Sequence, residues 1–254
     1  MNPTLELIEA RTSTRTYTSE PISEADRAAI LNAAFRAPTA GNMMLYSIIE
    51  VTDQALKDEL AVTCDDQPFI ATAPLVLVFL ADYQKWIDLF DRSLELSAPG
   101  SGPCAAPGAG DLMLAASDAL IAAQNAVVAA ESLGIGSCYI GDILEQGEAH
   151  AQLFGLPPHV MPVAMLCFGH PSATRAQVPR YTANMVHENR YRNLTAEELS
   201  RTAEELQQMH APHGIAPGAV DYPHVVHQRK YTSDFMAEMN RSVAWWLKRW
   251  GTRA

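Results

Sequence analysis

The sequence is poor in the residues that mark a disulfide scaffold or a nucleic-acid-binding surface. Its four cysteines, Cys64, Cys104, Cys138 and Cys167, are widely separated and form no CxxC pair, which argues against a disulfide framework and a zinc knuckle. Lys and Arg number 18 against 29 Asp and Glu, a formal net charge of -11. We therefore expect small-molecule partners, no nucleic acid, and a reducing cytoplasm as the location.

Length and apolar content predict one principal domain over residues 1–254. The chain is 48% hydrophobic and has no internal repeat, and its N-terminus lacks a basic segment followed by an apolar run, so no secretion signal is expected. The most apolar stretch, 112–133, is long enough to span a membrane but contains Asp118, Gln124, Asn125 and Glu131. We expect a buried helix there, and no membrane contact.

Periodicity and turn residues predict alternating helices and strands. Helices are expected over 3–9, from Ser23 to about Phe35, and over 111–133, 195–208 and 233–250. Strands are expected over 47–52, 75–80 and 163–168, with a short one between Gly134 and Gly141. Segments 75–80 and 163–168 are apolar without alternation, as expected of strands covered on both faces, so both belong in a central sheet.

Three further segments have distinctive composition. Residues 97–110 read SAPGSGPCAAPGAG, which sustains no helix and predicts a mobile insertion. The helix expected over 111–133 carries Ala on most of one side, which allows close packing and suggests the spine of a dimer. Residues 195–254 form a C-terminal helical extension, in which an apolar stripe predicts packing: Phe235, Met239, Val243, Trp246 and Trp250.

An anion-binding segment is indicated near the N-terminus. Arg11 and Arg15 lie four residues apart in the run Arg11-Thr12-Ser13-Thr14-Arg15, where a helix gives way to a turn. Two guanidinium groups pair with phosphate oxygens, and hydroxyl and backbone N–H groups complete the hydrogen bonds. Arginine pairs of this spacing also occur on solvated helix ends, so the pattern alone leaves both interpretations open.

Several features occur together with this segment. They are the loop 38–42, Gln67 before an apolar strand, the turn Tyr139-Ile140-Gly141 and the dipeptide Pro179-Arg180. With them the chain resembles the FMN-dependent nitroreductases, in the larger subgroup that contains the NADPH nitroreductases and flavin reductases. The resemblance spans nearly the whole chain. It implies an α+β fold with a central mixed sheet flanked by helices, and a homodimer with FMN at the interface held by residues of both chains.

The resemblance also implies roles for particular residues. Arg11, Thr12, Ser13 and Arg15 match the stretch that binds the FMN phosphate and ribityl chain, and Arg180 matches a second phosphate ligand. Thr39, Ala40 and Asn42 match the loop that contacts the flavin ring, and Gln67 matches a side chain that hydrogen-bonds the pyrimidine edge. Ile140 and Gly141 match residues whose backbone lies near flavin N5. Two departures stand out: Val178 replaces the usual Lys, and the ring loop lacks the usual serines and glutamine.

The implied activity is that of an NAD(P)H-dependent FMN oxidoreductase acting on nitroaromatics, quinones or flavin. Hydride would pass through flavin N5 in a ping-pong sequence, with no catalytic nucleophile from the protein. Hydrogen bonds and positive charge at the pyrimidine edge, from Gln67 and the region of Arg15, would stabilise reduced flavin. Two alternatives are a flavin reductase that supplies reduced FMN to a partner, and a flavin-binding sensor or storage protein without turnover, which Val178 favours.

Three remaining features have two interpretations each. Arg229 and Lys230 are suited to the 2'-phosphate of NADPH, or equally to a solvated helix start. The histidines His210, His213, His224 and His227 have HxxH spacing, but they are more typical of an exposed loop than of a metal site, so no metal is expected. Cys138, between glycines near the proposed flavin, is a small buried thiol or a reactive one, and His187 and Glu188 are interpreted as structural.

Overall fold

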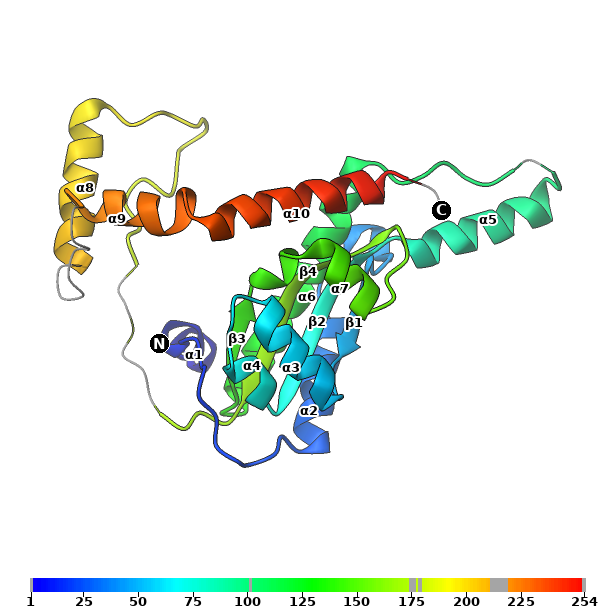
Figure 1. Cartoon of the computed structure of the whole chain (residues 1–254), viewed down its shortest axis with the longest axis horizontal. Coiled ribbons are helices and arrows are strands. Elements are labelled where there is room, and N and C mark those ends of the chain that lie inside the picture. Colours follow the sequence, from blue (N-terminus) through cyan, green and yellow to red (C-terminus); the bar gives the residue numbers. More distant parts are fainter. Residues whose placement is uncertain (1, 101, 174–176, 178–179, 211–218, 253–254) are drawn as a thin grey trace. The chain divides into compact units, whose positions relative to one another are not determined.

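The computed structural model describes residues 2–100, 102–173, 177, 180–210 and 219–252 (Figure 1). Internal contacts divide the chain into two compact units. The first comprises residues 1–175 with 238–254, and the second residues 176–237. The sequence analysis expects a single domain over 1–254, and this division into contact units leaves that expectation a prediction.

The first unit contains a four-stranded sheet and most of the helices. Its strands are β1 (Tyr46–Glu50), β2 (Leu75–Asp82), β3 (Gly136–Ile140) and β4 (Val160–Gly169). Its helices are α1 (Pro3–Ala10), α2 (Glu24–Phe35), α3 (Gln54–Thr63), α4 (Phe69–Thr72), α5 (Gln84–Ser97), α6 (Ala109–Ser132), α7 (Gly147–Leu153) and the part of α10 (Asp234–Trp250) from Glu238 on, with 3-10 turns η1 (Ala40–Asn42) and η2 (Asp142–Leu144).

The sheet has the order β1-β2-β4-β3, and its three pairings are all antiparallel. A mixed sheet was expected. Among the described residues, a parallel pairing occurs at the isolated bridge between Ser13 and Ser137, which lies outside the four strands. Helices cover both faces of the sheet, which confirms the expected α+β class.

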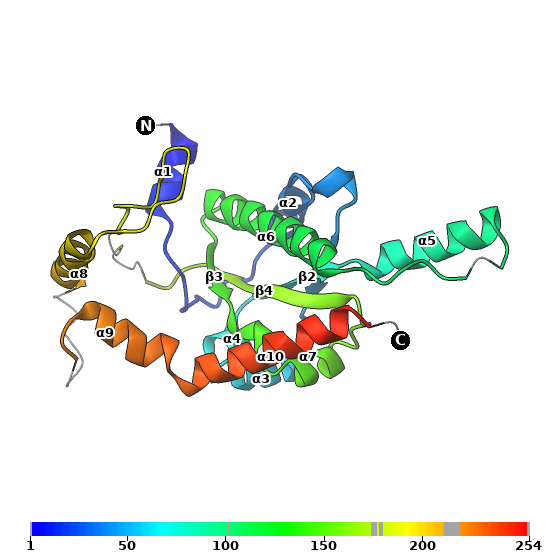
Figure 2. The same cartoon turned by 90° about the horizontal axis from the view of Figure 1, so that it is seen from above.

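Alternate residues of β2 point into two separate cores. Val76, Val78 and Leu80 pack on one face, in the layer that holds α3, α4, α7 and α10. Leu75, Leu77 and Phe79 pack on the other, against α2 and α6. Figure 2 shows the two helical layers on opposite sides of the sheet. Because both faces of β2 are covered, all eight of its residues are buried, as its unbroken apolar run predicts.

Helix α6 is the long helix that the sequence predicts, and one of its faces is buried in the core. By length and composition it passes as a membrane span, with a mean hydropathy of 1.5 in its most apolar window. However, it contacts α2 and β2, and Ala119, Ala122, Ala123 and Ala126 are each 0% exposed in the core. Small side chains on this face let the helix approach the sheet closely.

The helix ends follow local hydrogen bonds that the sequence indicates. Ser23 caps α2: its Oγ accepts from the N–H of Asp26 at 3.1 Å and donates to the Asp26 carboxylate at 2.7 Å. Asn2 and Asp53 cap α1 and α3, each by accepting a backbone N–H, from Leu5 and Leu56 respectively. At the other end of the chain, Trp246 and Trp250 of the predicted apolar stripe are buried, which confirms packing there.

The described part of the second unit consists of irregular backbone over 180–195 followed by helices. It contains α8 (Ala196–His210), α9 (Tyr222–Val226), the π-helical turn η4 (His227–Tyr231) and the first residues of α10. Tyr181 donates to the Glu205 carboxylate of α8 at 3.0 Å, and the rings of His210 and Tyr222 stack at 3.9 Å between centroids. The acidic helix expected over 195–208 is thus present. The mobility expected of 97–110 stays a prediction.

Candidate functional site

The segment from Arg11 to Thr18 runs along the sheet beside β3 and β4. The N–H of Thr14 donates to the Ser137 carbonyl at 2.9 Å, and the N–H of Thr18 donates to the His170 carbonyl at 2.9 Å. A Cβ atom on Gly136 would lie 2.2 Å from Thr14 Oγ1, so only glycine lets the segment approach this closely. The sheet therefore fixes the backbone around Thr12 and Ser13.

Arg11, at the C-terminal end of α1, carries an unpartnered buried nitrogen. Its Nη1 atom is shielded from solvent and has no hydrogen-bond partner in the described part of the chain. The positive charge acts on Glu131 and Tyr139, where it opposes the rise that burial gives to their pKa values. A buried guanidinium N–H without an acceptor is costly, so this position is suited to an anionic ligand that supplies one.

Arg15 contacts the start of α4, which directly follows the turn that carries Gln67. The Arg15 guanidinium lies 6.0 Å from the centroid of the Phe69 ring, in a cation–π arrangement. Gln67 lies two residues before Phe69 in the sequence, and the backbone N–H of Gln67 donates to the Ala61 carbonyl at 2.7 Å. The structure thus places two of the predicted ligands, one from the N-terminal segment and one from the turn before α4, near the same aromatic ring.

The Gln67 side chain also connects this group to the end of β3. Its Nε2 atom donates to the Cys64 carbonyl at 2.8 Å and to the Asp142 carboxylate at 2.9 Å. Asp142 follows Ile140 and Gly141 directly; Ile140 is buried at the end of β3 and Gly141 is exposed as the N-cap of η2. Gln67 and the predicted backbone contacts of Ile140 and Gly141 therefore form one cluster. Asp142 was not predicted by the sequence analysis.

The loop with Thr39, Ala40 and Asn42 is held by a different buried group. Asp118 of α6, which is 3% exposed, accepts from the N–H of Ala40 at 2.9 Å and from the N–H of Leu45 at 3.1 Å. Asn42 adopts a positive φ of 58°, a conformation that Asn tolerates better than most residues. Asp118 was noted in the sequence only as a charge within an apolar stretch, yet that isolated carboxylate was the signal for a buried polar role.

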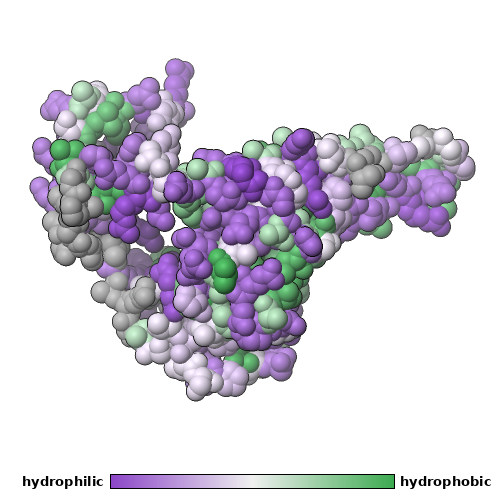
Figure 3. Space-filling view, in the orientation of Figure 1, coloured by the Kyte–Doolittle hydropathy of each residue, from purple (hydrophilic) through white to green (hydrophobic). Residues whose placement is uncertain are grey.

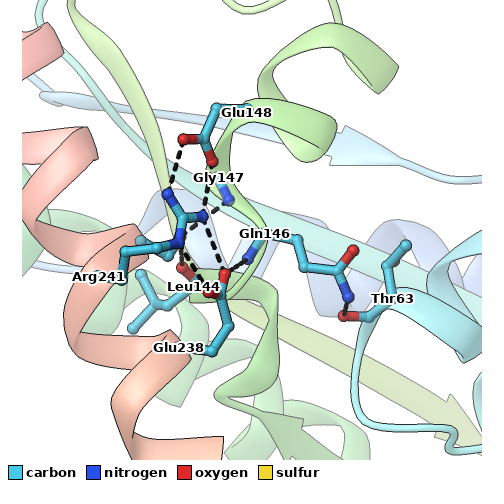
Figure 4. Close-up of polar contacts among 8 residues, drawn as sticks. Thr63, Leu144, Gln146, Gly147, Glu148, Glu238 and Arg241 are labelled. Atoms are coloured by element: carbon cyan, nitrogen blue, oxygen red, sulfur yellow. Dashed lines mark hydrogen bonds and ion pairs between the residues drawn. The ribbon is translucent and has the colours of Figure 1, made fainter.

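Side chains of helix α10 form hydrogen bonds and an ion pair with the segment that follows Gly141 (Figure 4). Ser242 Oγ accepts from the N–H of Gly147 at 2.8 Å and donates to the Leu144 carbonyl at 2.6 Å. Arg241 forms ion pairs of 2.7 Å with both Glu148 and Glu238, and Glu238 accepts from the N–H of Gln146. The C-terminal helix thus determines where the 141–148 segment lies.

Other predicted residues belong to other parts of the chain. Arg180 is exposed in the second unit, as are Arg229 and Lys230, whose ammonium lies 4.9 Å from the Phe235 ring centroid. Val178 and His213 lie outside the described residues. Within the part that the structure describes, no group of three or more His, Cys, Asp or Glu side chains is arranged to hold a metal ion. Cys138 is 1% exposed, the environment of a small buried thiol.

Comparison with known proteins identifies the class to which this fold and site belong. The model of the nitroreductase family matches residues 8–170. The chain is 37% identical over 216 residues to the oxygen-insensitive NADPH nitroreductase of Salmonella typhimurium, covering 84% of this chain and 85% of that protein. It is 32% identical over 219 residues to the NADPH-flavin oxidoreductase of Vibrio harveyi, with 83% and 84% covered.

A solved structure agrees with these relatives. The NADPH:FMN oxidoreductase from Vibrio harveyi, in complex with NAD+, superposes with a TM-score of 0.79 at 27% identity and covers 98% of each chain. The chain belongs to the nitroreductase family. This confirms the resemblance inferred from the sequence, while the roles of the individual ligands stay predictions.

Proposed function

We propose that the protein is an NAD(P)H-dependent FMN oxidoreductase that reduces small acceptors of the nitroaromatic, quinone or flavin class. The family assignment supports the reaction class, and the names of the Salmonella typhimurium and Vibrio harveyi relatives support NADPH as donor and nitro compounds or flavin as acceptors. We further propose that it acts in the cytoplasm. The structural observation that carries the proposal is the buried, unpartnered Nη1 atom of Arg11.

The residues of the cluster fit FMN. Arg11 and Arg15 supply positive charge, and Thr12 and Ser13 supply hydroxyl groups, beside a backbone that β3 holds in place. We assign this segment to the phosphate and ribityl chain, with Arg180 as a second phosphate ligand. A fixed set of donors binds a phosphate without paying the entropy of ordering a flexible loop.

The ring of the cofactor is assigned to the Gln67 cluster and the loop held by Asp118. When bound, FMN supplies the redox chemistry by accepting hydride from a nicotinamide and passing electrons to the acceptor. Gln67 would hydrogen-bond the pyrimidine edge, and the backbone of Ile140 and Gly141 would lie along the ring. Thr39, Ala40 and Asn42 would contact the ring from their own loop.

We propose that the active protein is a homodimer. Large apolar side chains are exposed along α6 at helical spacing: Met113 is 68% exposed, Leu114 51%, Leu120 43% and Ile121 41%. A stripe of this kind on a helix whose opposite face is buried supports a protein–protein contact. On the face drawn in Figure 3, by contrast, hydrophilic residues predominate and hydrophobic ones form small groups.

A flavin reductase that supplies reduced FMN to a partner is the second candidate, supported by the name of the Vibrio harveyi relative, an NADPH-flavin oxidoreductase. The two candidates differ in their preferred acceptor. Steady-state rates with free FMN and with a nitroaromatic, measured on the same holoprotein with NADPH, separate them. Faster turnover of free FMN favours the reductase.

The phosphate assignment is tested by replacing Arg11 with Met, which keeps an unbranched, flexible side chain but removes the buried guanidinium. Because Nη1 has no acceptor in the ligand-free protein, R11M should leave the stability of the apoprotein unchanged or higher. The same change should weaken FMN binding by at least about tenfold, since a charge-assisted contact is lost. Exposed Arg36, replaced in the same way, is the control. Unchanged FMN affinity in R11M would contradict the assignment.

A further inference from the structure

Gln67 is oriented by the acceptors that surround its amide nitrogen. Nε2 has two hydrogens, and the Cys64 carbonyl and the Asp142 carboxylate lie 2.8 and 2.9 Å from it. A carbonyl only accepts hydrogen bonds, so the NH₂ end of the amide must face inward. The Gln67 carbonyl oxygen is then the end presented to a ligand, and it is suited to a ligand N–H.

Asp142 has a second carboxyl partner, Glu145. Glu145 follows η2, is 6% exposed, and lies within hydrogen-bonding reach of the Asp142 side chain. Its Oε1 atom is buried and has no partner within the described residues. Two ionised carboxylates in contact at a buried position repel each other strongly, whereas one shared proton turns the contact into a hydrogen bond.

The other charges around Glu145 act in the same direction. Burial, and then the negative charges of Asp142, of Asp65 from the turn after α3 and of Glu238 from α10, raise the pKa of Glu145 to about 7. Arg241 is shared between Glu238 and Glu148. Burial lowers the pKa of His150 on α7, so its ring, between the Ile143 carbonyl and Thr63, is neutral near pH 7.

The thiol of Cys64 adds no charge to this group. Burial and the carboxylates of Asp142 and Glu145 raise its pKa far above neutral, so it stays protonated. Neither the Cys64 thiol nor the His150 ring therefore carries a charge near pH 7.

We propose that Asp142 and Glu145 hold one proton between them, and that this proton fixes the Gln67 amide and sets the charge beside the flavin. The inference rests on the proposed function, since it needs FMN to lie against Gln67. Asp142 and Glu145 are then positioning residues, because they act through Gln67 and through their charge. With the proton in place, Asp142 accepts from both Glu145 and Gln67, and the pair carries one negative charge.

Loss of that proton has two consequences. The second negative charge drives the two carboxyls apart and so moves the Asp142 acceptor that orients Gln67. It also opposes the negative charge that reduction adds to the flavin, so reduction raises the proton affinity of the pair and draws one proton from solvent. The flavin midpoint potential must therefore depend more steeply on pH where the pair titrates.

The test is spectroelectrochemical titration of the holoprotein between about pH 6 and 9, the interval that brackets the titration of the pair. E145Q keeps the shape of the side chain and a donor to Asp142, but it carries no titrating proton. The wild-type potential should fall more steeply with pH than that of E145Q. E148Q, which removes a neighbouring carboxylate outside the pair, should follow the wild type.

Two further measurements keep the inference testable if E145Q folds poorly. Removing the Asp65 charge in D65N should move the steep interval to lower pH; Asp65 has a positive φ of 62°, which Asn also adopts. In the wild-type apoprotein, the Glu145 carboxyl followed by carbon NMR should titrate well above an ordinary glutamate. A Glu145 that titrates at the ordinary value would overturn the inference.

The outcomes also separate this inference from the proposed function. If wild type and E145Q both bind FMN and their potentials have the same pH slope, the shared proton is wrong and the proposed function stands. If no FMN binds at any pH, both are wrong.

Discussion

The buried carboxylate of Asp118 accepts a hydrogen bond from the backbone N–H of Ala40 at 2.9 Å, across 78 positions of sequence. The same carboxylate accepts from the N–H of Leu45, so one side chain of α6 holds both ends of the loop that carries Thr39 and Asn42. Trp86 adds a third contact, from its indole N–H to the Met43 carbonyl at 2.9 Å. The loop is thus ordered by the core rather than by its own sequence.

Replacing Asp118 with Ala should therefore disturb this loop. D118A leaves two backbone N–H groups without their acceptor, which should lower the free energy of unfolding by about 2–4 kcal/mol. The FMN affinity should fall as well, because the ring loop loses its anchor. Urea unfolding and fluorescence titration with FMN measure the two effects. D58A, at an exposed carboxylate paired with Gln54, is the control and should change stability by less than about 0.5 kcal/mol.

Gly136 determines how closely the N-terminal segment approaches β3. A Cβ at this position would lie 2.2 Å from Thr14 Oγ1, so G136A should push the segment with Arg11 and Ser13 off the strand. We expect a loss of about 1–3 kcal/mol in stability, the usual cost of overpacking, together with weaker FMN binding. G110A meets no atom within 4 Å and should be neutral or stabilising. Wild-type FMN affinity in G136A would contradict this account of the segment.

The stability of E145Q should depend on pH in a defined sense. The pKa of Glu145 is raised to about 7 in the folded chain, so the wild type loses stability as pH rises from the unfolded value of about 4.3 to about 7. Near pH 5, E145Q and wild type should be similarly stable. Near pH 8, E145Q should be more stable by about 1–3 kcal/mol.

Urea unfolding at the two pH values measures this difference. E148Q supplies the opposite sign, because Arg241 lowers the pKa of Glu148 and the ionised form of that carboxylate is stabilising. E148Q should therefore be less stable than wild type at both pH values, and the difference should shrink only as pH falls below the unfolded value of about 4.3. Equal stabilities of E145Q and wild type at both pH values would contradict the raised pKa of Glu145.

The exposed stripe of α6 should mediate dimer formation. A charge at Leu114, in L114D, would have to be desolvated in the interface and should raise the dimer dissociation constant by at least about tenfold. Leu247 of α10 has a similar exposure of 52%, so L247D is a matched control. Sedimentation equilibrium of the three proteins tests the assignment. A wild type that is monomeric at micromolar concentration would contradict it.

The sequence predicted the elements whose signals are local. The apolar run of β2, the capping residue Ser23 and the Ala-rich face of α6 each determine their element through contacts close in sequence or through burial on both faces. Short helices such as α4 and α7 were not predicted. Their residues carry no long hydrophobic period, and tertiary contacts such as that between Ser242 and Gly147 hold them in place.

The candidate site was predictable in part, for the same reason. The spacing of Arg11 and Arg15 is visible in the sequence, whereas the partners that fix Gln67 and Ala40 come from Asp142 and Asp118, many positions away. No local pattern marks such a partner. A single carboxylate in an apolar helix is the nearest available signal, because a buried charge needs partners.

The most direct test of the account is an anaerobic visible spectrum of the purified protein, recorded before and after addition of NADPH and, separately, NADH. We expect an oxidised-flavin spectrum, as purified or after FMN is added, that bleaches with a nicotinamide. The nicotinamide that bleaches it faster is the preferred donor. A protein that neither contains nor binds FMN would contradict the phosphate assignment of Arg11. Bound FMN that neither nicotinamide reduces would instead indicate a flavin-binding protein without turnover.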